Sequence, residues 1–97
     1  MTEAVIVATA RSPIGRAGKG SLVDLRPDDM SAQIVTALME KVPEVQASDV
    51  EDLIMGCGQP AGEAGFNIGR IVAGLAGLDD VPGVAVNRCC SSSLQTI

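Results

Sequence analysis

The residues best suited to chemistry are two adjacent cysteines, Cys89 and Cys90, within the run VAVNRCCSSSLQTI at positions 84–97. The first residues of this run predict a buried strand, and a helix is expected to begin near Cys90. Unpaired backbone N–H groups and the positive end of a helix dipole would stabilise a thiolate there and help to hold an acyl oxygen. A strand-to-helix turn also lies at the carboxyl edge of a parallel sheet, where α/β folds place their sites. The run therefore predicts a nucleophilic cysteine.

These physical arguments do not choose between the two cysteines. Neighbouring side chains on a helix diverge by about 100°, so only one of the pair is expected to point into a given pocket. The third cysteine, Cys57, falls in an expected strand, where a free cysteine is most often a small buried hydrophobic residue. With three cysteines and no histidine, neither a disulfide framework nor a metal site is predicted. Reduced thiols favour a cytoplasmic location.

The composition limits the classes of protein to which the chain can belong. Its 97 residues suffice for one domain or part of one, and its net charge of −5 argues against nucleic-acid binding. No apolar run approaches the roughly 18–20 residues of a membrane span. Four of the seven basic residues come early, and we interpret them as a solvated loop rather than a phosphate site: Arg11, Arg16, Lys19 and Arg26.

The first third of the chain predicts one strand and one helix. Residues 4–10 (AVIVATA) form a continuous apolar run rich in β-branched residues, typical of a strand buried on both faces. A glycine-containing loop follows to about Arg26. A helix is expected to begin at Pro27 and to end at Lys41, before Pro43. Its expected apolar face consists of Met30, Ile34, Ala37 and Leu38.

The remainder of the chain repeats the alternation of strand and helix. Strands are expected at 53–57 and 84–86, with a Gly/Pro-rich loop at 58–65 that is expected either to guard the site or to lie near a subunit contact. A second helix would carry Ile68, Ile71, Val72 and Leu75 on one face and end near Gly77. A third would begin around Cys90, with Leu94 as its core anchor. The order β-α-β-α-β-α predicts an α/β fold with parallel strands, and the short last helix predicts a fragment of a larger fold.

Three segments carry a resemblance to the thiolase family. Residues 87–95 (NRCCSSSLQ) resemble the thiolase active-site motif, with Cys89 at its variable position and Cys90 at the nucleophile. Residues 4–15 (AVIVATARSPIG) resemble the first strand and the loop after it, with Ser12 in place of the usual Thr. Residues 65–70 (GFNIGR) resemble the Gly-x-Asn-x-Ala-Arg segment. Gly69 stands where that segment has Ala, a change expected to affect only local helix stability.

The resemblance implies a layered αβαβα fold, with residues 1–97 as the N-terminal part of the thiolase N-terminal domain. It implies thiolytic cleavage of 3-ketoacyl-CoA, or the reverse Claisen condensation, through an acyl-enzyme on Cys90. Coenzyme A would be a substrate, no cofactor would be bound permanently, and the partners would be the rest of the thiolase chain in a homodimer or homotetramer. Thiolases take their remaining catalytic His and Cys from the C-terminal half, so the 97 residues alone are expected to be inactive.

Two alternatives stay open on the sequence alone. Related ketosynthases carry a string similar to CSSSL, although it follows Asp-Thr-Ala rather than Asn87-Arg88. A non-catalytic thiolase-like lipid-binding protein would keep the fold without the activity. The residues that distinguish these classes lie in the C-terminal half of such proteins.

Overall fold

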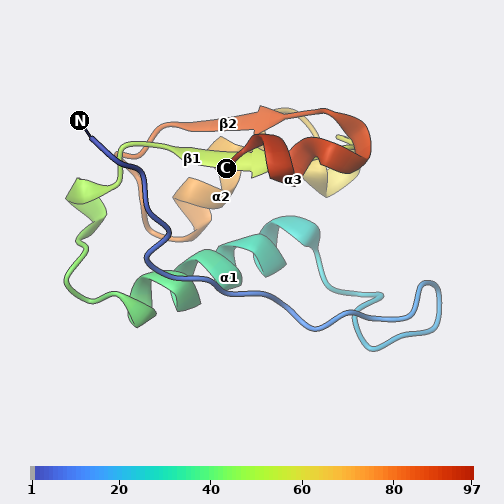
Figure 1. The fold of residues 1–97 in the computed structure, drawn as a ribbon. Coiled ribbons are helices and arrows are strands. Elements are labelled where there is room, and N and C mark those ends of the chain that lie inside the picture. Colours follow the sequence, from blue (N-terminus) through green and yellow to red (C-terminus); the bar gives the residue numbers. More distant parts are fainter. Residues whose placement is uncertain (1) are drawn as a thin grey trace.

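The computed structural model describes residues 2–97, which form three α-helices, two strands and three short 3₁₀ turns. The elements follow the order α1 (Pro27–Lys41), η1 (Ala47–Asp49), β1 (Leu53–Gly56), η2 (Gly62–Ala64), α2 (Ile68–Leu75), β2 (Gly83–Val86), η3 (Cys89–Ser91) and α3 (Ser92–Gln95). Figure 1 shows α1 below the two strands, with α2 between α1 and the strands and α3 beside them. Within residues 2–97, no helix is long and apolar enough to cross a membrane.

The centre of the fold is a β1-α2-β2 crossover. The two strands are parallel and pair from Leu53↔Gly83 to Gly56↔Val86, which confirms the predicted α/β class and places both strands within one residue of expectation. Parallel strands need a crossover connection, and α2 supplies it. The apolar spacing of α2 buries Ile68 and Val72 against the sheet, at 2% and 0% exposure.

Close backbone contact between α2 and β2 requires glycine. A Cβ added to Gly69 would lie 2.4 Å from the Val84 carbonyl oxygen, and one on Gly83 would lie 2.5 Å from the Arg70 nitrogen. The expectation that Gly69 affects only local helix stability is therefore wrong. In this chain Gly69 also sets how closely the helix approaches the strand.

Helix α1 has the predicted bounds but buries a different face. Pro27 occupies the first turn, and Lys41 the last. The residues packed against Ile68 and Val72 of α2 are Ala32 and Val35. The predicted face instead borders a hollow beneath the N-terminal loop, lined in part by Met30, Ile34 and Ala37. Because α1 has apolar residues on two sides, its periodicity alone did not determine which side meets the core.

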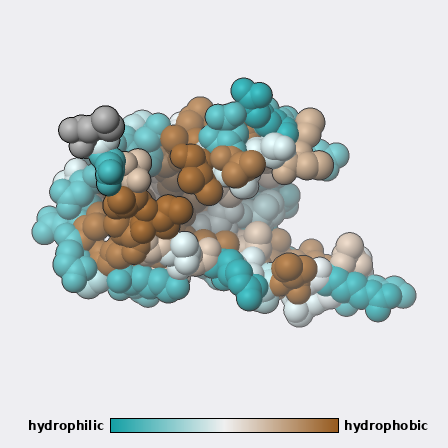
Figure 2. Space-filling model, in the orientation of Figure 1, coloured by the Kyte–Doolittle hydropathy of each residue, from teal (hydrophilic) through white to brown (hydrophobic). Residues whose placement is uncertain are grey.

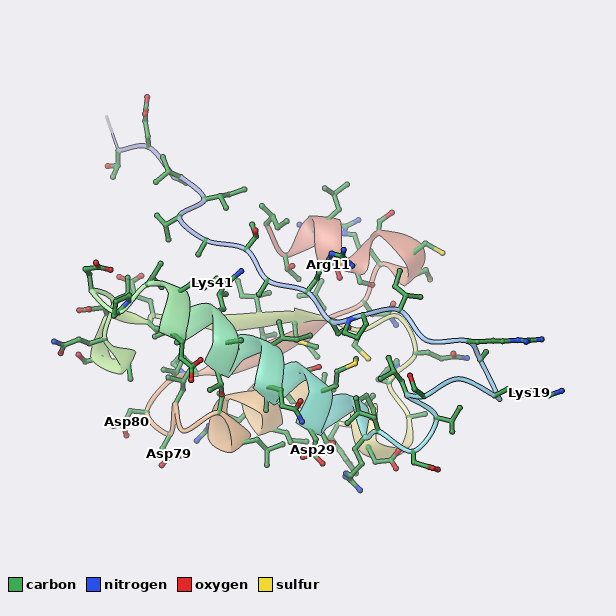
Figure 3. The ribbon with its side chains drawn as sticks, turned by 90° about the horizontal axis from the view of Figure 1, so that it is seen from below. Arg11, Lys19, Asp29, Lys41, Asp79 and Asp80 are labelled. Atoms are coloured by element: carbon green, nitrogen blue, oxygen red, sulfur yellow. The ribbon has the colours of Figure 1, made fainter. Side chains whose placement is uncertain are left out.

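An ion pair joins the start of α1 to the loop between β1 and α2. Two nitrogens of the Arg26 guanidinium donate to the carboxylate oxygens of buried Asp28, at 3.1 and 2.9 Å. This hydrogen bonding holds the pKa of Asp28 below its ordinary value, assisted by the Asp29 backbone N–H. The same guanidinium lies 3.9 Å from Glu63. The other early basic residues, such as Lys19 at the tip of the loop, are exposed, as expected (Figure 3).

The predicted strand at residues 4–10 is not formed. This segment is extended but unpaired, and its apolar side chains are exposed, with Ile6 at 73%. Hydrophobic side chains gather on the surface where the segment passes α1 (Figure 2). Its one side-chain hydrogen bond to a helix comes from Lys41, whose Nζ donates to the Thr9 carbonyl at 2.7 Å (Figure 3). A strand buried on both faces needs a neighbour to pair with, and residues 11–97 provide none.

Helix α3 also departs from expectation. It contains four residues, and Leu94, expected to be a core anchor, is 77% exposed. The buried residue of α3 is Ser92, at 4% exposure. A helix this short presents only one side chain to the sheet, and the contact falls on the residue nearest the turn.

Candidate active site

The site is built on the turn that follows β2. Cys89 has a φ of +50°, and residues Cys89–Ser91 form the 3₁₀ turn η3 that leads into α3. A non-glycine residue in this left-handed region costs on the order of 1–3 kcal/mol and persists only where its surroundings fix it. Such backbone strain concentrates at functional sites, so the turn itself indicates that this position is specified.

Side-chain hydrogen bonds fix the turn. The Cys89 backbone N–H donates to Asn87 Oδ1 at 2.8 Å. The Ser92 hydroxyl accepts from the Arg88 backbone N–H at 2.9 Å and donates to the Cys89 carbonyl at 2.7 Å. These bonds give the Arg88 and Cys89 N–H groups side-chain partners, and they add a second donor to the Cys89 carbonyl, which also accepts from the Ser92 backbone N–H.

The end of β1 and the residues after it pack directly against the turn. A Cβ on Gly56 would lie 2.7 Å from the Ser93 backbone nitrogen, and one on Gly58 would lie 2.9 Å from the Cys89 carbonyl oxygen. Any larger residue at Gly56 would have to push α3 away from the strand. The two glycines therefore allow the turn after β2 to rest directly on the segment after β1.

Both cysteines border one hollow at this place. It measures about 360 Å³ and is lined by Gly58, Gln59, Cys89 and Cys90. Both thiols are free and exposed. Both cysteines line this hollow, although neighbours on a helix were expected to face different ways. The positive φ of Cys89 turns the backbone between them out of helical geometry.

The turn also differs from the expected helix N-terminus. Cys90 precedes a four-residue helix, whose few aligned peptide dipoles sum to much less than those of a long helix. What the structure provides around Cys90 is an exposed thiol on a fixed turn at the carboxyl edge of the parallel sheet, the place predicted for it.

The other polar and sulfur-bearing residues of the resembling segments have structural partners. Cys57 is half-buried, with its sulfur 3.7 Å from the Ala64 carbonyl, which agrees with the expected packing role. Asn67 Nδ2 donates to the Gly83 carbonyl at 2.7 Å, and Arg70 donates to the Asp79 carbonyl at 2.9 Å. These bonds tie α2 to the start of β2 rather than to the hollow. Residues 2–97 bring together no group of three or more potential metal ligands.

Sequence reasoning associated the loop 58–65 with the site without singling out Gln59, and it did not single out Ser92. Gln59 reaches the hollow because adjacent parallel strands end at the same edge, so the loops after β1 and β2 meet. That signal was present in the predicted topology. Ser92 was not predicted, because no sequence signal distinguishes it from Ser91 and Ser93.

Comparison with known proteins agrees with this fold. The family described as "Thiolase, N-terminal domain" matches residues 4–97. The 3-ketoacyl-CoA thiolase of Bacillus subtilis (strain 168) is 47% identical over 98 residues, which cover 100% of this chain and 25% of the relative. The beta-ketoadipyl-CoA thiolase of Acinetobacter baylyi is 46% identical over 98 residues, covering 100% and 24%. The 3-ketoacyl-CoA thiolase of Cronobacter sakazakii is 41% identical, covering 100% and 25%.

The chain thus spans about a quarter of the length of the curated relatives that it matches. The match favours thiolases over the ketosynthase alternative, because both the family description and these relatives carry the thiolase name. Since the family match includes nearly every residue, from the unpaired N-terminal segment to the cysteine turn, the chain belongs to the thiolase family.

Proposed function

We propose that the complete protein is a 3-ketoacyl-CoA thiolase, an acetyl-CoA acyltransferase, in which Cys90 is the nucleophile and residues 1–97 belong to the N-terminal domain. The observation that carries the proposal is the exposed Cys90 thiol on a strained, hydrogen-bonded turn beside a hollow. The names of the relatives support the reaction class. Coenzyme A enters as a substrate and not as a resident cofactor.

The reaction would proceed by covalent catalysis in two halves. The Cys90 thiolate attacks the 3-keto carbon of a 3-ketoacyl-CoA, and the bond between C2 and C3 breaks. The departing carbanion of acetyl-CoA takes up a proton and leaves, while the shortened acyl group remains as a thioester on Cys90. The thiolate of a second coenzyme A then attacks this thioester, releases the acyl-CoA and regenerates the Cys90 thiolate.

This chain supplies the nucleophile and its setting but not the whole catalytic apparatus. The mechanism also needs a base for the thiols, an acid for the carbanion and donors for the oxyanion. The 97 residues contain no histidine. We therefore expect the isolated chain to show no thiolysis of 3-ketoacyl-CoA. Turnover by the purified 97-residue chain would contradict this division of roles.

The assembly and location of the enzyme form part of the proposal. A homodimer or homotetramer follows from the thiolase resemblance, and sedimentation of the full-length protein would measure it. A cytoplasmic location fits the three free cysteines, since reducing compartments keep thiols reduced. Fractionation of cells that produce the protein would test the location.

Steady-state kinetics of two matched variants test the nucleophile. In the full-length protein, Cys90→Ala should lower kcat for thiolysis by about 10⁴-fold or more, the scale seen when a catalytic nucleophile is removed. Cys89→Ala, one residue away in the same hollow, should keep kcat within about tenfold. The reverse pattern would transfer the role to Cys89. A wild-type protein that binds acyl-CoA without turnover would instead support the non-catalytic lipid-binding alternative.

A further inference from the structure

We propose that Ser92 is a positioning residue for Cys90, and that its hydroxyl holds the nucleophile turn in its strained conformation. This inference rests on the proposed function, because it concerns how Cys90 is presented to the substrate. It adds a residue that acts through the backbone and does not touch the reacting atoms.

The geometry singles out Ser92 among the three consecutive serines. Its side chain is buried, at 4% exposure, and it makes two hydrogen bonds to the turn. One comes from the Arg88 N–H and the other goes to the Cys89 carbonyl, at 2.9 and 2.7 Å. The hydroxyl therefore spans Cys89 from both sides. Ser91 and Ser93 are exposed, and neither hydroxyl makes a hydrogen bond to the turn.

Those two bonds connect Ser92 with the strain at Cys89. A positive φ at a non-glycine residue persists only when neighbouring groups over-determine it. Removing the hydroxyl would take its partner from the Arg88 N–H and would leave the Cys89 carbonyl with the Ser92 backbone N–H as its donor. The peptide between Cys89 and Cys90, held by fewer bonds, could then rotate toward a relaxed conformation. The Cys90 thiol would move with it.

The expected consequence is a loss of rate rather than a loss of substrate affinity. A displacement of about 1 Å at a reacting atom can cost about 100-fold in rate. Substrate binding depends on contacts spread over the whole acyl-CoA, and it would change little. The signature of positioning is therefore a lower kcat at nearly constant KM.

The test uses Ser92→Ala in the full-length protein, with Thr96→Val as the matched control. Thr96 is the C-cap of the same helix and makes the same kind of hydroxyl-to-carbonyl bond three residues back, to Ser93 at 2.8 Å, but away from the cysteine turn. We expect Ser92→Ala to lower kcat about 100-fold with KM within about threefold, and Thr96→Val to match the wild type. Ser92→Thr, which keeps the hydroxyl, should recover most of kcat.

A second readout separates positioning from a general loss of structure. Alkylation of Cys90 by iodoacetamide, followed peptide by peptide with mass spectrometry, should change in rate for Ser92→Ala. Alkylation of Cys57, which follows β1 and whose sulfur lies 3.7 Å from the Ala64 carbonyl oxygen, should not change. If Ser92→Ala proves poorly folded, Asn87→Ala removes the other side-chain bond to the turn from an exposed position, and kcat should fall about tenfold.

Three results would overturn the proposal. They are a wild-type kcat in Ser92→Ala, a fall in kcat no larger than the fraction of unfolded protein, and a rise in KM at unchanged kcat. Failure here is distinguishable from failure of the proposed function. An active Cys90→Ala enzyme would refute the nucleophile itself, whereas an inactive Cys90→Ala enzyme beside a fully active Ser92→Ala enzyme would refute only the role of Ser92.

Discussion

Two apolar segments of this chain look alike in sequence and differ in structure. Residues 4–10 and helix α2 are both rich in aliphatic side chains. Val72 of α2 is fully buried, at 0% exposure, while Ile6 of the N-terminal segment is 73% exposed. Helix α2 lies inside a crossover whose two strands are only some thirty residues apart along the chain. Residues 4–10 are extended and unpaired.

The difference shows that an apolar sequence makes burial of a segment possible, whereas the presence of neighbouring elements determines whether the segment is buried. Helix α2 lies beside β1, β2 and α1, and its backbone hydrogen bonds are made within the helix and with the residues directly before and after it. An extended segment must take its hydrogen bonds from a neighbouring strand. The sheet of residues 2–97 contains only β1 and β2, which pair with each other.

The largest expected effect is on stability, and it compares a buried side chain of α2 with an exposed side chain in the N-terminal region. In the 97-residue chain, Ile68→Ala should lower the free energy of unfolding by about 2–5 kcal/mol, because it opens a cavity in the core. Ile14→Ala, at a side chain that is 95% exposed, should change it by no more than about 0.5 kcal/mol. Urea unfolding monitored by circular dichroism measures both. Equal losses would show that the N-terminal region packs as tightly as α2.

A smaller effect is expected where β1 meets the cysteine turn. Gly56→Ala places a Cβ 2.7 Å from the Ser93 nitrogen, and the backbone shift needed to relieve this contact should cost about 1–3 kcal/mol. Thermal unfolding measures the loss of stability. Gly18→Ala offers a contrast in the N-terminal loop, because nothing lies within 4 Å of its Cβ position and only its φ of +72° opposes the change. A Gly56→Ala protein as stable as the wild type would refute the close packing.

The smallest effect concerns the ion pair between Arg26 and Asp28 at the start of α1. The Asp28 carboxyl has its pKa lowered below the ordinary 3.8, chiefly by the Arg26 hydrogen bonds. A carboxyl with a lowered folded pKa contributes stability above its unfolded pKa and loses that contribution as the pH falls through the folded value. Asp28→Asn should therefore reduce the acid sensitivity of stability below about pH 4.

The Asp28 effect should be slight because the Arg26 side chain is 53% exposed to solvent. Unfolding midpoints of wild type and Asp28→Asn at pH 3 and pH 7 measure it. If the midpoint differs between pH 3 and pH 7 by the same amount in Asp28→Asn as in the wild type, Asp28 does not contribute to the acid sensitivity. Glu40→Gln serves as the control, because Glu40 is an exposed carboxyl outside the ion pairs of residues 2–97.

Sequence reasoning predicted the elements whose signals are local. Helix α1 has its predicted bounds because Pro27 and Pro43 delimit it, and β1, α2 and β2 follow from apolar spacing and glycine. Three features depend on distant contacts and were not predicted: the unpaired state of residues 4–10, the buried side of α1 and the exposure of Leu94.

The candidate site divides in the same way. The strand-to-turn position of Cys89 and Cys90 was predicted, because adjacent parallel strands end at one edge. The positive φ of Cys89 was not, since it arises from three hydrogen bonds made by side chains on either side of it. Both cysteines line the hollow beside this turn.

The acyl-enzyme itself tests the central claim most directly. The full-length protein would be mixed with a 3-ketoacyl-CoA in the absence of free coenzyme A, quenched in acid, digested and analysed by mass spectrometry. The account predicts an acyl group on Cys90 in the wild type and in Cys89→Ala, and none in Cys90→Ala. Acylation of Cys89 in the wild type, or a stoichiometric acyl group in Cys90→Ala, would contradict it.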